Sequence, residues 1–411
     1  MFENIDVLVI GAGPAGTVAS ALLVKKGYKV TILEKAYFPR FFIGESLLPQ
    51  CMDELEKVGM LEPVHAHGFQ YKNGAAFRYR DRYESFDFGE NHTKGWDHTY
   101  QVQRADFDTI LAKEAEKVGV KIHYGHEITA ADFSPDLPLL SCRTRDGKSH
   151  QIQARFVLDC AGSAKVLPRF LNLEIPSELP PRSSLFTHVT DNIRDRNYDR
   201  EKILITIHPR RRDVWYWLIP FSNDTASVGV VGEAAFINSF SGTPLEKLRA
   251  TMKEDATLSD LLNNAAYDFP VSRTDGYSSN VKTLHGKNYA LLGNAGEFLD
   301  PVFSSGVTLA LKSASLAVPA VDKQLKGENV SWENAFAKPL MQGVDTFREF
   351  VNAWYDGNLQ NIIFSDVKAP QIKAMICSVL AGYAWDTDNP CVREPQRRLK
   401  VLSEMCRDMD L

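Results

Sequence analysis

The residue types best suited to chemistry stand in a glycine-rich turn close to the start of the chain. The turn reads Gly11, Ala12, Gly13, Pro14, Ala15 and Gly16, which is the spacing G-x-G-x-x-G. The first glycine permits a tight turn, the second lets the backbone approach a pyrophosphate, and the third lets a helix pack closely against a strand. The amides and the dipole at the N-terminus of that helix attract an anion. This pattern predicts a dinucleotide-binding site.

An acidic residue stands where the other half of such a site needs one. Glu34 lies 18 residues after Gly16 and ends a second apolar run over 29–33. A carboxylate at that place accepts hydrogen bonds from the hydroxyls of an adenosine ribose. The alternative is a glycine-rich turn in some other α/β domain, and the strand, helix, strand and acid in register argue against it.

The segment that follows adds candidate cofactor-binding residues. They are Lys35, Arg40, Gly44 and Ser46. Arg40 can pair with a phosphate, and the alternative is a surface charge. A helix is expected over 47–59, and Gly44 and Ser46 just before it offer backbone amides and a capping hydroxyl. We expect this loop to lie along the dinucleotide.

The elements that must position these residues alternate between strands and helices. Alternation of apolar residues predicts strands in 69–88, 120–160 and 183–235, and helical spacing predicts a long helix over 306–324. The expected fold class is therefore α/β, with interleaved domains. We expect a Rossmann-like dinucleotide-binding domain from 1–70, 100–180 and 280–325, a substrate-binding β-sheet domain from 71–99 and 181–279, and a helical C-terminal region over 326–411.

The composition of the 411 residues limits the classes of function. The net charge of −5, with 44% hydrophobic and 24% charged residues, argues against a nucleic-acid or anionic membrane surface. No apolar stretch is long enough to predict a membrane span. The six cysteines form no C-x-x-C pair, so neither a metal site nor a disulfide framework is expected. Since the N-terminal residues also lack signal-peptide features, we expect a cytoplasmic protein.

Two further motifs give the chain a resemblance to FAD-dependent oxidoreductases of the aromatic hydroxylase type. Their D-A-x-G and G-D-A…D-P motifs correspond to Asp159, Cys160, Ala161 and Gly162, and to Gly293, Asn294, Ala295, Asp300 and Pro301. The resemblance covers roughly residues 1–325. It implies FAD as the cofactor, with Arg104 and Asp159 contacting or ordering it, and a plain salt bridge is the alternative for both. Asn294 replaces the family's acid, which keeps a hydrogen bond but loses a charge.

Within that superfamily the chain resembles the flavin-dependent halogenases, in the branch that acts on phenols and pyrroles. Trp215, Trp217, Ile219 and Pro220 fit the family motif W-x-W-x-I-P, and Phe298, Pro301, Ser304 and Gly306 fit F-x-x-P-x-x-S-x-G. The loop over 38–49 is typical of this branch. Lys72 falls where the family keeps its essential lysine.

The resemblance implies that an electron-rich aromatic substrate is halogenated through a flavin C4a-hydroperoxide and hypohalous acid. Ser304, Ser305 and Gly306 would hold the halide, and Lys72 would steer the hypohalous acid through a hydrogen bond or a haloamine. The substrate is a small aromatic molecule, free or carrier-bound. Because the chain has no second G-x-G-x-x-G for a nicotinamide nucleotide, a separate flavin reductase is expected. Phe303 replaces the glutamate of tryptophan halogenases, which suits a substrate that its own hydroxyl or pyrrole nitrogen activates.

Each assignment has a structural alternative. The 304–306 turn can be only a helix cap, Lys72 a solvated surface group, and the tryptophan strand only packing between the two domains. The run Arg210–Arg212 is expected to be solvated, and the alternative is a docking site for an acidic carrier or reductase. The C-terminal region, rich in aromatic residues, is expected to cover the substrate pocket. Other functions left open are an FAD monooxygenase or dehydrogenase on an aromatic or polyene substrate, and a flavin-binding protein without catalysis.

Overall fold

The glycine-rich turn joins a strand and a helix of a mostly parallel sheet. The computed structural model describes residues 5–278, 280–366 and 369–409. The first strand, β1 (Ile5–Ile10), is buried along almost its whole length and pairs with a parallel strand on each of its two edges. The helix α1 (Pro14–Lys25) follows with Pro14 in its first turn, where the missing N–H has no intrahelical partner to lose.

The first sheet has the mostly parallel arrangement that the predicted α/β fold class requires. Its strands are, in spatial order, β18 (His285–Gly286), β19 (Tyr289–Leu291), β10 (Ser149–Asp159), β1, β2 (Val30–Glu34) and β7 (Lys121–Tyr124), with β9 (Leu139–Thr144) and β8 (His126–Asp132) continuing from β10. The strands from β19 to β7 are parallel to one another. Strand β1 therefore lies in the middle, and its C-terminal end points at the edge where ligands of such sheets bind.

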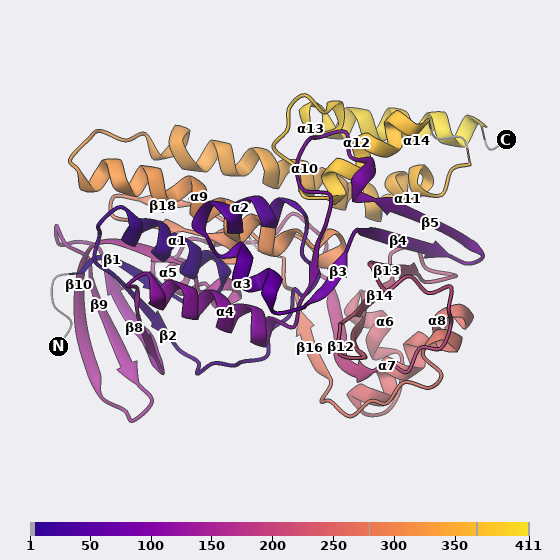
Figure 1. The fold of residues 1–411 in the computed structure, drawn as a ribbon, viewed down its shortest axis with the longest axis horizontal. Coiled ribbons are helices and arrows are strands. Elements are labelled where there is room, and N and C mark those ends of the chain that lie inside the picture. The colour runs from indigo at the N-terminus through magenta and orange to yellow at the C-terminus, as the bar shows by residue number, and fades with distance from the viewer. Residues whose placement is uncertain (1–4, 279, 367–368, 410–411) are drawn as a thin grey trace.

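A second sheet of seven strands lies beside the first, at the right of Figure 1. Its spatial order is β16 (Ser272–Asp275), β12 (Ser183–Thr190), β15 (Thr225–Gly232), β14 (Trp215–Pro220), β13 (Lys202–Ile207), β4 (Gly74–Tyr79) and β5 (Arg82–Asp87). Only β13 and β4 run parallel. Two small sheets pair β3 (Gln70–Lys72) with β6 (Thr99–Gln101) and β11 (Glu174–Ile175) with β17 (Asn280–Val281). The two large sheets take strands from alternating parts of the sequence, as expected for interleaved domains.

The helices cover the sheets in two groups. Those that accompany the first sheet are α1, α2 (Gln50–Val58), α3 (Leu61–Ala66), α4 (Arg104–Lys117), α5 (Val166–Phe170) and α9 (Ser305–Leu325), while α6 (Ala234–Asn238), α7 (Pro244–Met252) and α8 (Ala256–Leu261) accompany the second. The C-terminal region forms α10 (Lys338–Tyr355), α11 (Asn358–Ile363), α12 (Pro370–Leu380), α13 (Pro390–Arg393) and α14 (Pro395–Met409). Figure 1 shows these last helices gathered above the second sheet. The predicted long helix over 306–324 is confirmed by α9.

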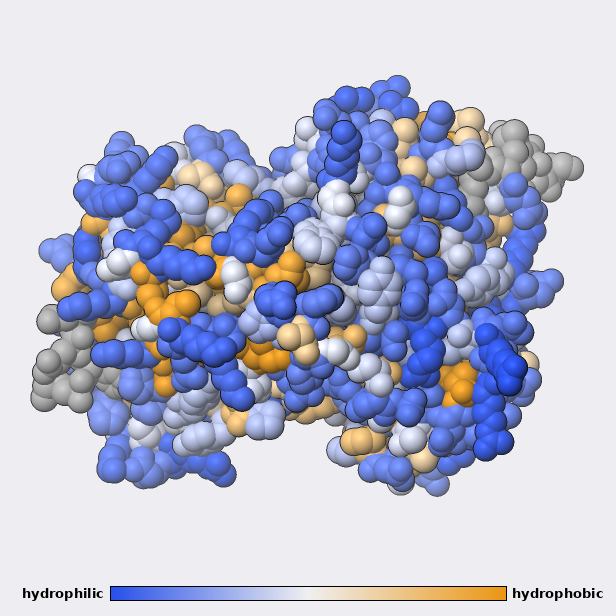
Figure 2. Space-filling view, in the orientation of Figure 1, coloured by the Kyte–Doolittle hydropathy of each residue, from blue (hydrophilic) through white to orange (hydrophobic). Residues whose placement is uncertain are grey.

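The second sheet has two apolar faces because its strands alternate buried side chains. Ile203, Ile205 and Trp217 belong to the large core shared with the first sheet and the C-terminal helices, whereas Leu204 and Leu218 belong to a separate core under α7 and α8. The face seen in Figure 2 is mostly hydrophilic. Among the described residues, no helix combines the length and the hydropathy that crossing a bilayer would require.

Candidate active site

The three glycines of the turn are required for different reasons. Gly11 has φ +95°, and a Cβ there would lie 2.7 Å from the carbonyl oxygen of Cys160. A Cβ on Gly16 would lie 2.0 Å from the carbonyl oxygen of Gly11. A Cβ on Gly13 would meet only Arg40 Nη2, at 3.8 Å. Gly11 and Gly16 are thus required by the packing of the chain itself, while the space at Gly13 is left for a ligand that approaches the backbone.

Charged groups surround the space at Gly13. Arg40 reaches it while its Nη1 lies 3.2 Å from Asp108 Oδ2 and its Nε 3.9 Å from Glu34 Oε1. Glu34 is buried at the end of β2, where Oε2 accepts a hydrogen bond of 2.8 Å from the amide of Ala12. The arrangement offers a guanidinium to a phosphate and a fixed carboxylate to a ribose. Lys35 instead forms an exposed ion pair with Glu127 on the surface.

Arg104 fixes the loop that follows β2. Its guanidinium makes a two-pronged contact with Asp108, at 2.8 and 3.0 Å, and donates to the carbonyl oxygen of Ile43 at 2.9 Å. Gly44 has φ +99°, and a Cβ there would lie 3.2 Å from Arg104 Nη1. Arg104 is therefore an ordering residue of the loop through a buried salt bridge, which is the alternative stated for it above.

The expected cap at Ser46 is wrong. The helix α2 begins at Gln50, after Pro49, and Ser46 instead forms a bridge with Gln101 of β6. The hydroxyl of Ser46 is buried and makes no hydrogen bond within the described part of the chain. Sequence reasoning missed this because an unpredicted extended segment comes between the loop and the helix.

Asp159 and the motif around Gly293 shape the other side of the site. The carboxylate of Asp159 accepts hydrogen bonds from the amides of Ala161 (2.9 Å) and Leu167 (2.6 Å), so it orders the turn that contains Gly162. Burial raises the pKa of Asp159 to about 6. Gly293 has φ +55°, as its turn requires, and Asn294 Oδ1 lies 3.9 Å from the place of a Cβ on Gly306. The structure thus brings the two motifs of 293–295 and 304–306 together.

The turn before α9 differs from an ordinary helix cap. Ser304 has φ +56° and stands at the N-cap position of this 21-residue helix, yet its side chain makes no capping hydrogen bond. The first amides of a helix have no intrahelical acceptors, so those at Ser305 and Gly306 suit an anion. Pro301 begins the short 3₁₀ turn that leads into this position.

Lys72 is buried at the end of β3, so its interpretation as a solvated surface group is wrong. Its side chain is 1% exposed, and Nζ donates a hydrogen bond of 2.7 Å to the carbonyl oxygen of Leu47. Burial lowers the pKa of Lys72 to about 7, because it takes the ammonium out of water. The residues that line its small cavity are Leu48, Lys72, Ala75, Phe77, Ile203, Ile205, Val302, Phe303, Ser304 and Leu380. The lysine and the serine turn, far apart in sequence, thus share one largely apolar cavity.

The tryptophan strand packs as its alternation predicts. Trp215 and Trp217 are buried on the face of β14 turned to the first sheet and the C-terminal helices, with ring centroids 6.0 Å apart. The ring of Trp217 fills the space beside Gly229, where a Cβ would lie 2.3 Å away. Trp215 Nε1 donates to the hydroxyl of Tyr355 at 3.1 Å. Ile219 shares their face, and Pro220 ends the strand. This is the packing role stated above.

Two buried pairs near the site were not found from the sequence. His188 Nε2 lies 2.6 Å from Glu45 Oε1, and Tyr355 donates a hydrogen bond of 2.9 Å to Asp300 Oδ2. Burial raises the pKa of Asp300 to about 6. Each pair joins residues more than 50 positions apart, and no local pattern signals such a contact.

The arginine run offers no free basic surface. Arg210 pairs with Glu254, Arg211 with Asp213 and Glu233, and Arg212 donates to Gln360 at 2.8 Å. The carboxylates compensate the charges of Arg210 and Arg211, whereas Arg212, through its hydrogen bond to the neutral side chain of Gln360, links the segment before β14 to α11.

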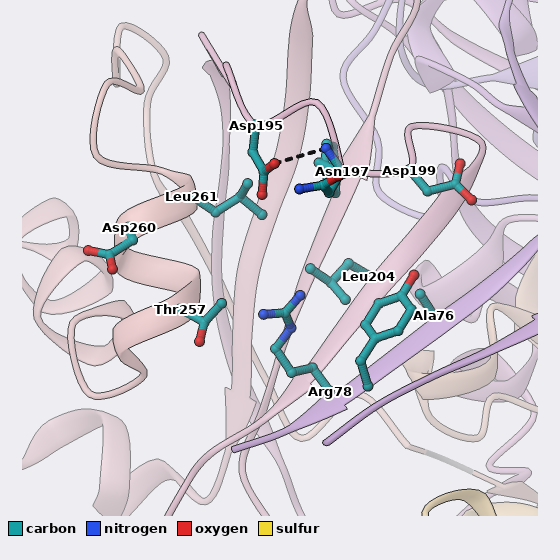
Figure 3. A pocket seen from close by; sticks show the side chains of 11 residues that line it. Ala76, Arg78, Asp195, Asn197, Asp199, Leu204, Thr257, Asp260 and Leu261 are labelled. Atoms are coloured by element: carbon teal, nitrogen blue, oxygen red, sulfur yellow. Dashed lines mark hydrogen bonds between the residues drawn. The ribbon is translucent and has the colours of Figure 1, made fainter. Parts of the chain in front are cut away.

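A larger cavity of about 280 Å³ lies on the opposite face of the second sheet (Figure 3). Ala76 and Leu204 form part of its wall, whereas Ala75, Ile203 and Ile205 line the cavity of Lys72. Because neighbouring residues of a strand face opposite sides, the sheet itself separates the two cavities. Its lining residues include neither the glycine turn nor Lys72 and Ser304.

Sequence similarity to known proteins shows to which family this chain belongs. A family model for the FAD binding domain matches residues 4–233. The chain is 33% identical over 339 residues to the tryptophan 2-halogenase of Chondromyces crocatus (79% of this chain, 62% of the relative) and 30% over 355 residues to the flavin-dependent halogenase armH3 of Armillaria mellea (81% and 70%). It is 28% identical over 434 residues to the 1H-pyrrole-2-carbonyl-(peptidyl-carrier protein) chlorinase of Pseudomonas fluorescens (98% and 92%).

A solved structure is similar over its whole length. The flavoprotein/dehydrogenase from Cytophaga hutchinsonii shares 42% sequence identity with this chain, with a TM-score of 0.96 and complete coverage of both chains. These relationships define an FAD-dependent oxidoreductase. The chain belongs to the flavin-dependent halogenase family. It spans 62% of the length of the tryptophan 2-halogenase.

Proposed function

We propose that this enzyme halogenates an electron-rich aromatic compound, a phenol or a pyrrole, with hypohalous acid as the halogen donor. The observation that carries the proposal is the shared cavity of Lys72 and Ser304. Within the described residues Lys72 has a backbone hydrogen bond but no ion pair, and a charged lysine in an apolar cavity is expensive to bury. Few structural roles need one. A reaction that requires a hydrogen-bond donor away from bulk water accounts for it.

The cofactor and the halide have separate places in this proposal. Reduced FAD would supply the capacity to activate dioxygen. The residues that would hold it are Gly11, Gly13, Pro14, Ala15, Gly16, Glu34, Arg40, Gly44, Ser46, Ala161, Gly162, Gly293, Asn294, Pro301 and Gly306, while Arg104 and Asp159 order the backbone around it. The unpartnered hydroxyl of Ser46 and the space at Gly13 fit such a ligand. The halide lies at the amides of Ser305 and Gly306, beside Ser304.

Lys72 binds the oxygen of hypohalous acid and turns its halogen toward the substrate. The ring carbon donates an electron pair to the halogen, the O–X bond breaks, the carbon loses its proton, and water is released. A hydrogen bond from an ammonium to the departing oxygen stabilises the charge that develops there. The apolar wall keeps the oxidant from reacting with other side chains.

The composition of the cavity supports a self-activating substrate. Phe303 stands at the wall with its ring 6.0 Å from that of Trp354, so no carboxylate is present at that position to take a proton from the ring. A phenol or pyrrole is nucleophilic without such a base. The substrate is either free or bound to a carrier, and a separate reductase supplies the reduced flavin.

Bromination with chemically reduced FAD tests the proposal. The chain is supplied with reduced FAD, oxygen, bromide and a panel of phenols and pyrroles, and products are examined for the bromine isotope pair by mass spectrometry. We expect brominated product from the wild type and none from Lys72→Met. The matched control is Lys202→Met, because Lys202 is also buried but pairs with Asp199 at 2.7 Å. Bromination that survives in Lys72→Met would contradict the assignment of Lys72.

A second candidate function is that of an FAD monooxygenase or dehydrogenase on an aromatic or polyene substrate. The likeness to the flavoprotein/dehydrogenase over the full length of both chains favours it. The same experiment separates the two. Hydroxylated product without bromine, or NADPH consumption by this chain alone, would support the second candidate.

A further inference from the structure

The cavity of about 280 Å³ in Figure 3 lies outside the site of Lys72 and has a charged side chain in its floor. Ala76 and Arg78, alternate residues of β4, share one face of that strand, and Leu204 stands beside Ala76 in β13. The segment over 195–199 and the helix α8 form the sides. Small-molecule sites have volumes of about 300–1,000 Å³, so a cavity near the lower end of that range suits a small ligand.

The guanidinium of Arg78 lacks an acceptor. Its Nε is buried without a hydrogen bond, and its guanidinium forms no ion pair with any residue that the structure describes. Its Cζ lies 5.5 Å from the centroid of the Tyr83 ring, a cation–π contact that satisfies none of the N–H donors. Polar groups in this state are costly to leave unpaired. A carboxylate in the cavity would accept two parallel N–H···O bonds from Arg78.

An acceptor faces the arginine across the cavity. Figure 3 shows Asp195 and Arg78 reaching into the space from opposite sides. The amide of Asn197 donates a hydrogen bond of 2.9 Å to Asp195 Oδ1, which fixes the carboxylate. Among the ion pairs that the described residues form, none joins Asp195 to Arg78. The space between them is therefore bounded by a hydrogen-bond donor on one side and an acceptor on the other.

Two other carboxylates line the cavity but are less suited to bind a ligand. Lys202 Nζ compensates the charge of Asp199 at 2.7 Å. Asp260 is exposed on α8, and Figure 3 shows its carboxylate turned away from Arg78. Asp195 is therefore the carboxylate that can receive a donor inside the cavity.

These charges select a ligand that carries both signs. An anion alone would be repelled by Asp195, and a cation alone would be repelled by Arg78. A molecule with a carboxylate and an ammonium pairs with both residues, and its apolar part can cover Ala76, Leu204 and Leu261. An α-amino acid with an apolar side chain has this chemistry.

We propose that this cavity is a second ligand site, which binds a small apolar α-amino acid through its carboxylate at Arg78 and its ammonium at Asp195. No covalent bond is made or broken there. The second sheet separates the cavity from Lys72, so the bound molecule is not the one that is halogenated, and the site does not rest on the proposed function.

Calorimetric titration of the FAD-loaded chain with L-leucine and with L-methionine tests the proposal. Neither probe is an electron-rich aromatic compound, so neither is a substrate of the proposed reaction. We expect saturable binding that Arg78→Met and Asp195→Asn each weaken by about tenfold or more, the effect of losing hydrogen bonds between charged groups. The matched control is Arg273→Met, because Arg273 belongs to the same sheet but pairs with Asp275 at 2.9 Å. No saturable binding in the wild type, or full affinity in either cavity variant, would overturn the proposal.

Two analogues test the same contacts in the unaltered protein. N-acetyl-L-leucine lacks the ammonium and L-leucine methyl ester lacks the carboxylate, so we expect each to bind more weakly than L-leucine by about tenfold or more. An analogue that binds as well as L-leucine would contradict the assigned contact. Lys72→Met should keep its affinity for L-leucine, and a loss there would place the ligand on the other side of the sheet. A wild type that binds L-leucine in this way but makes no brominated product would contradict the proposed function and support the second site.

Discussion

The ammonium of Lys72 donates its hydrogen bond to the carbonyl oxygen of Leu47, 25 residues earlier in the chain, at 2.7 Å. Leu47 directly follows the loop over 35–46, called the cofactor loop because we propose that it lies along FAD. The hydrogen bond therefore attaches the lysine to the backbone that carries Gly44 and Ser46. A lysine ammonium has three donors, and the other two remain for the cavity that Ser304 also lines. This contact couples the position of the proposed catalytic group to that of the cofactor loop.

The first prediction concerns the pH dependence of bromination. Burial lowers the pKa of Lys72 to about 7, and the nearby thiol of Cys51, with its pKa raised to about 11 by burial, stays neutral in this range. Oxidant that escapes from the enzyme is captured by a 1,3-diketone scavenger in bulk solution. If the ammonium is the active form, the ratio of brominated substrate to brominated scavenger falls as the pH rises through 7. This ratio is measured at pH 6, 7, 8 and 9 with FAD binding verified at each. A rise over the same range would instead indicate that the neutral amine reacts as a haloamine.

The second prediction is that Lys72→Met stabilises the protein while it abolishes halogenation. In the unfolded chain the lysine has its usual pKa of 10.5, so between about 7 and 10.5 the unfolded state binds more protons and stability rises with pH. Below pH 7 the wild type carries the full cost of the buried charge, up to ~5 kcal/mol. We therefore expect the gain of Lys72→Met in free energy of unfolding to be largest below pH 7 and to shrink toward pH 10. Denaturant unfolding at pH 6 and pH 9.5 measures this, and equal gains would contradict the low pKa.

The features of the fold that depend on local patterns of residues could be predicted from the sequence alone. The strand, turn and helix around Gly11–Gly16, the helix α9 and the alternation of Trp215 and Trp217 follow from the residues themselves. The bridge of Ser46 to Gln101 and the pairs Glu45–His188 and Tyr355–Asp300 do not, because each depends on how distant segments meet. The burial of Lys72 could be predicted only in part. A lysine in a polar loop is usually a solvated surface group, and only the family resemblance indicated a functional role for Lys72.

The third prediction concerns Tyr355, whose hydroxyl links Trp215 to Asp300. Tyr355→Phe leaves Trp215 Nε1 without its acceptor and removes a hydrogen bond that lowers the pKa of Asp300. We expect a loss of ~1–3 kcal/mol in stability. The control is Tyr198→Phe, because the hydroxyl of Tyr198 is buried but makes no hydrogen bond within the described residues, so its removal costs little. Equal losses in the two variants, measured by denaturant unfolding, would contradict the linking role.

The fourth prediction is that the carboxyl group of Asp300 makes the stability of the folded protein depend on pH. Burial raises the pKa of Asp300 from 3.8 to about 6, so the folded state binds more protons than the unfolded state between these values. The contribution of Asp300 to stability is therefore complete below pH 4 and is lost as the pH rises through 6. We expect Asp300→Asn to remove this dependence, which is seen by comparing the two proteins in thermal unfolding at pH 5 and pH 8. An unchanged difference between the two pH values would mean that another group is responsible.

The last prediction separates glycines that fold the turn from the glycine that leaves room for the cofactor. A methyl group at residue 16 would lie 2.0 Å from the carbonyl oxygen of Gly11, so Gly16→Ala must move α1 away from the strand and destabilise the protein even without FAD. A methyl group at residue 13 meets only the end of the flexible Arg40 side chain at 3.8 Å, and the backbone there, with φ −72°, accepts alanine. Gly13→Ala should therefore keep the unfolding temperature of the apoprotein and weaken FAD binding by about tenfold or more, because the backbone can no longer approach the pyrophosphate. Flavin fluorescence titration and thermal unfolding of the apoproteins measure the two effects. Full FAD affinity in Gly13→Ala would show that the pyrophosphate does not lie against this residue.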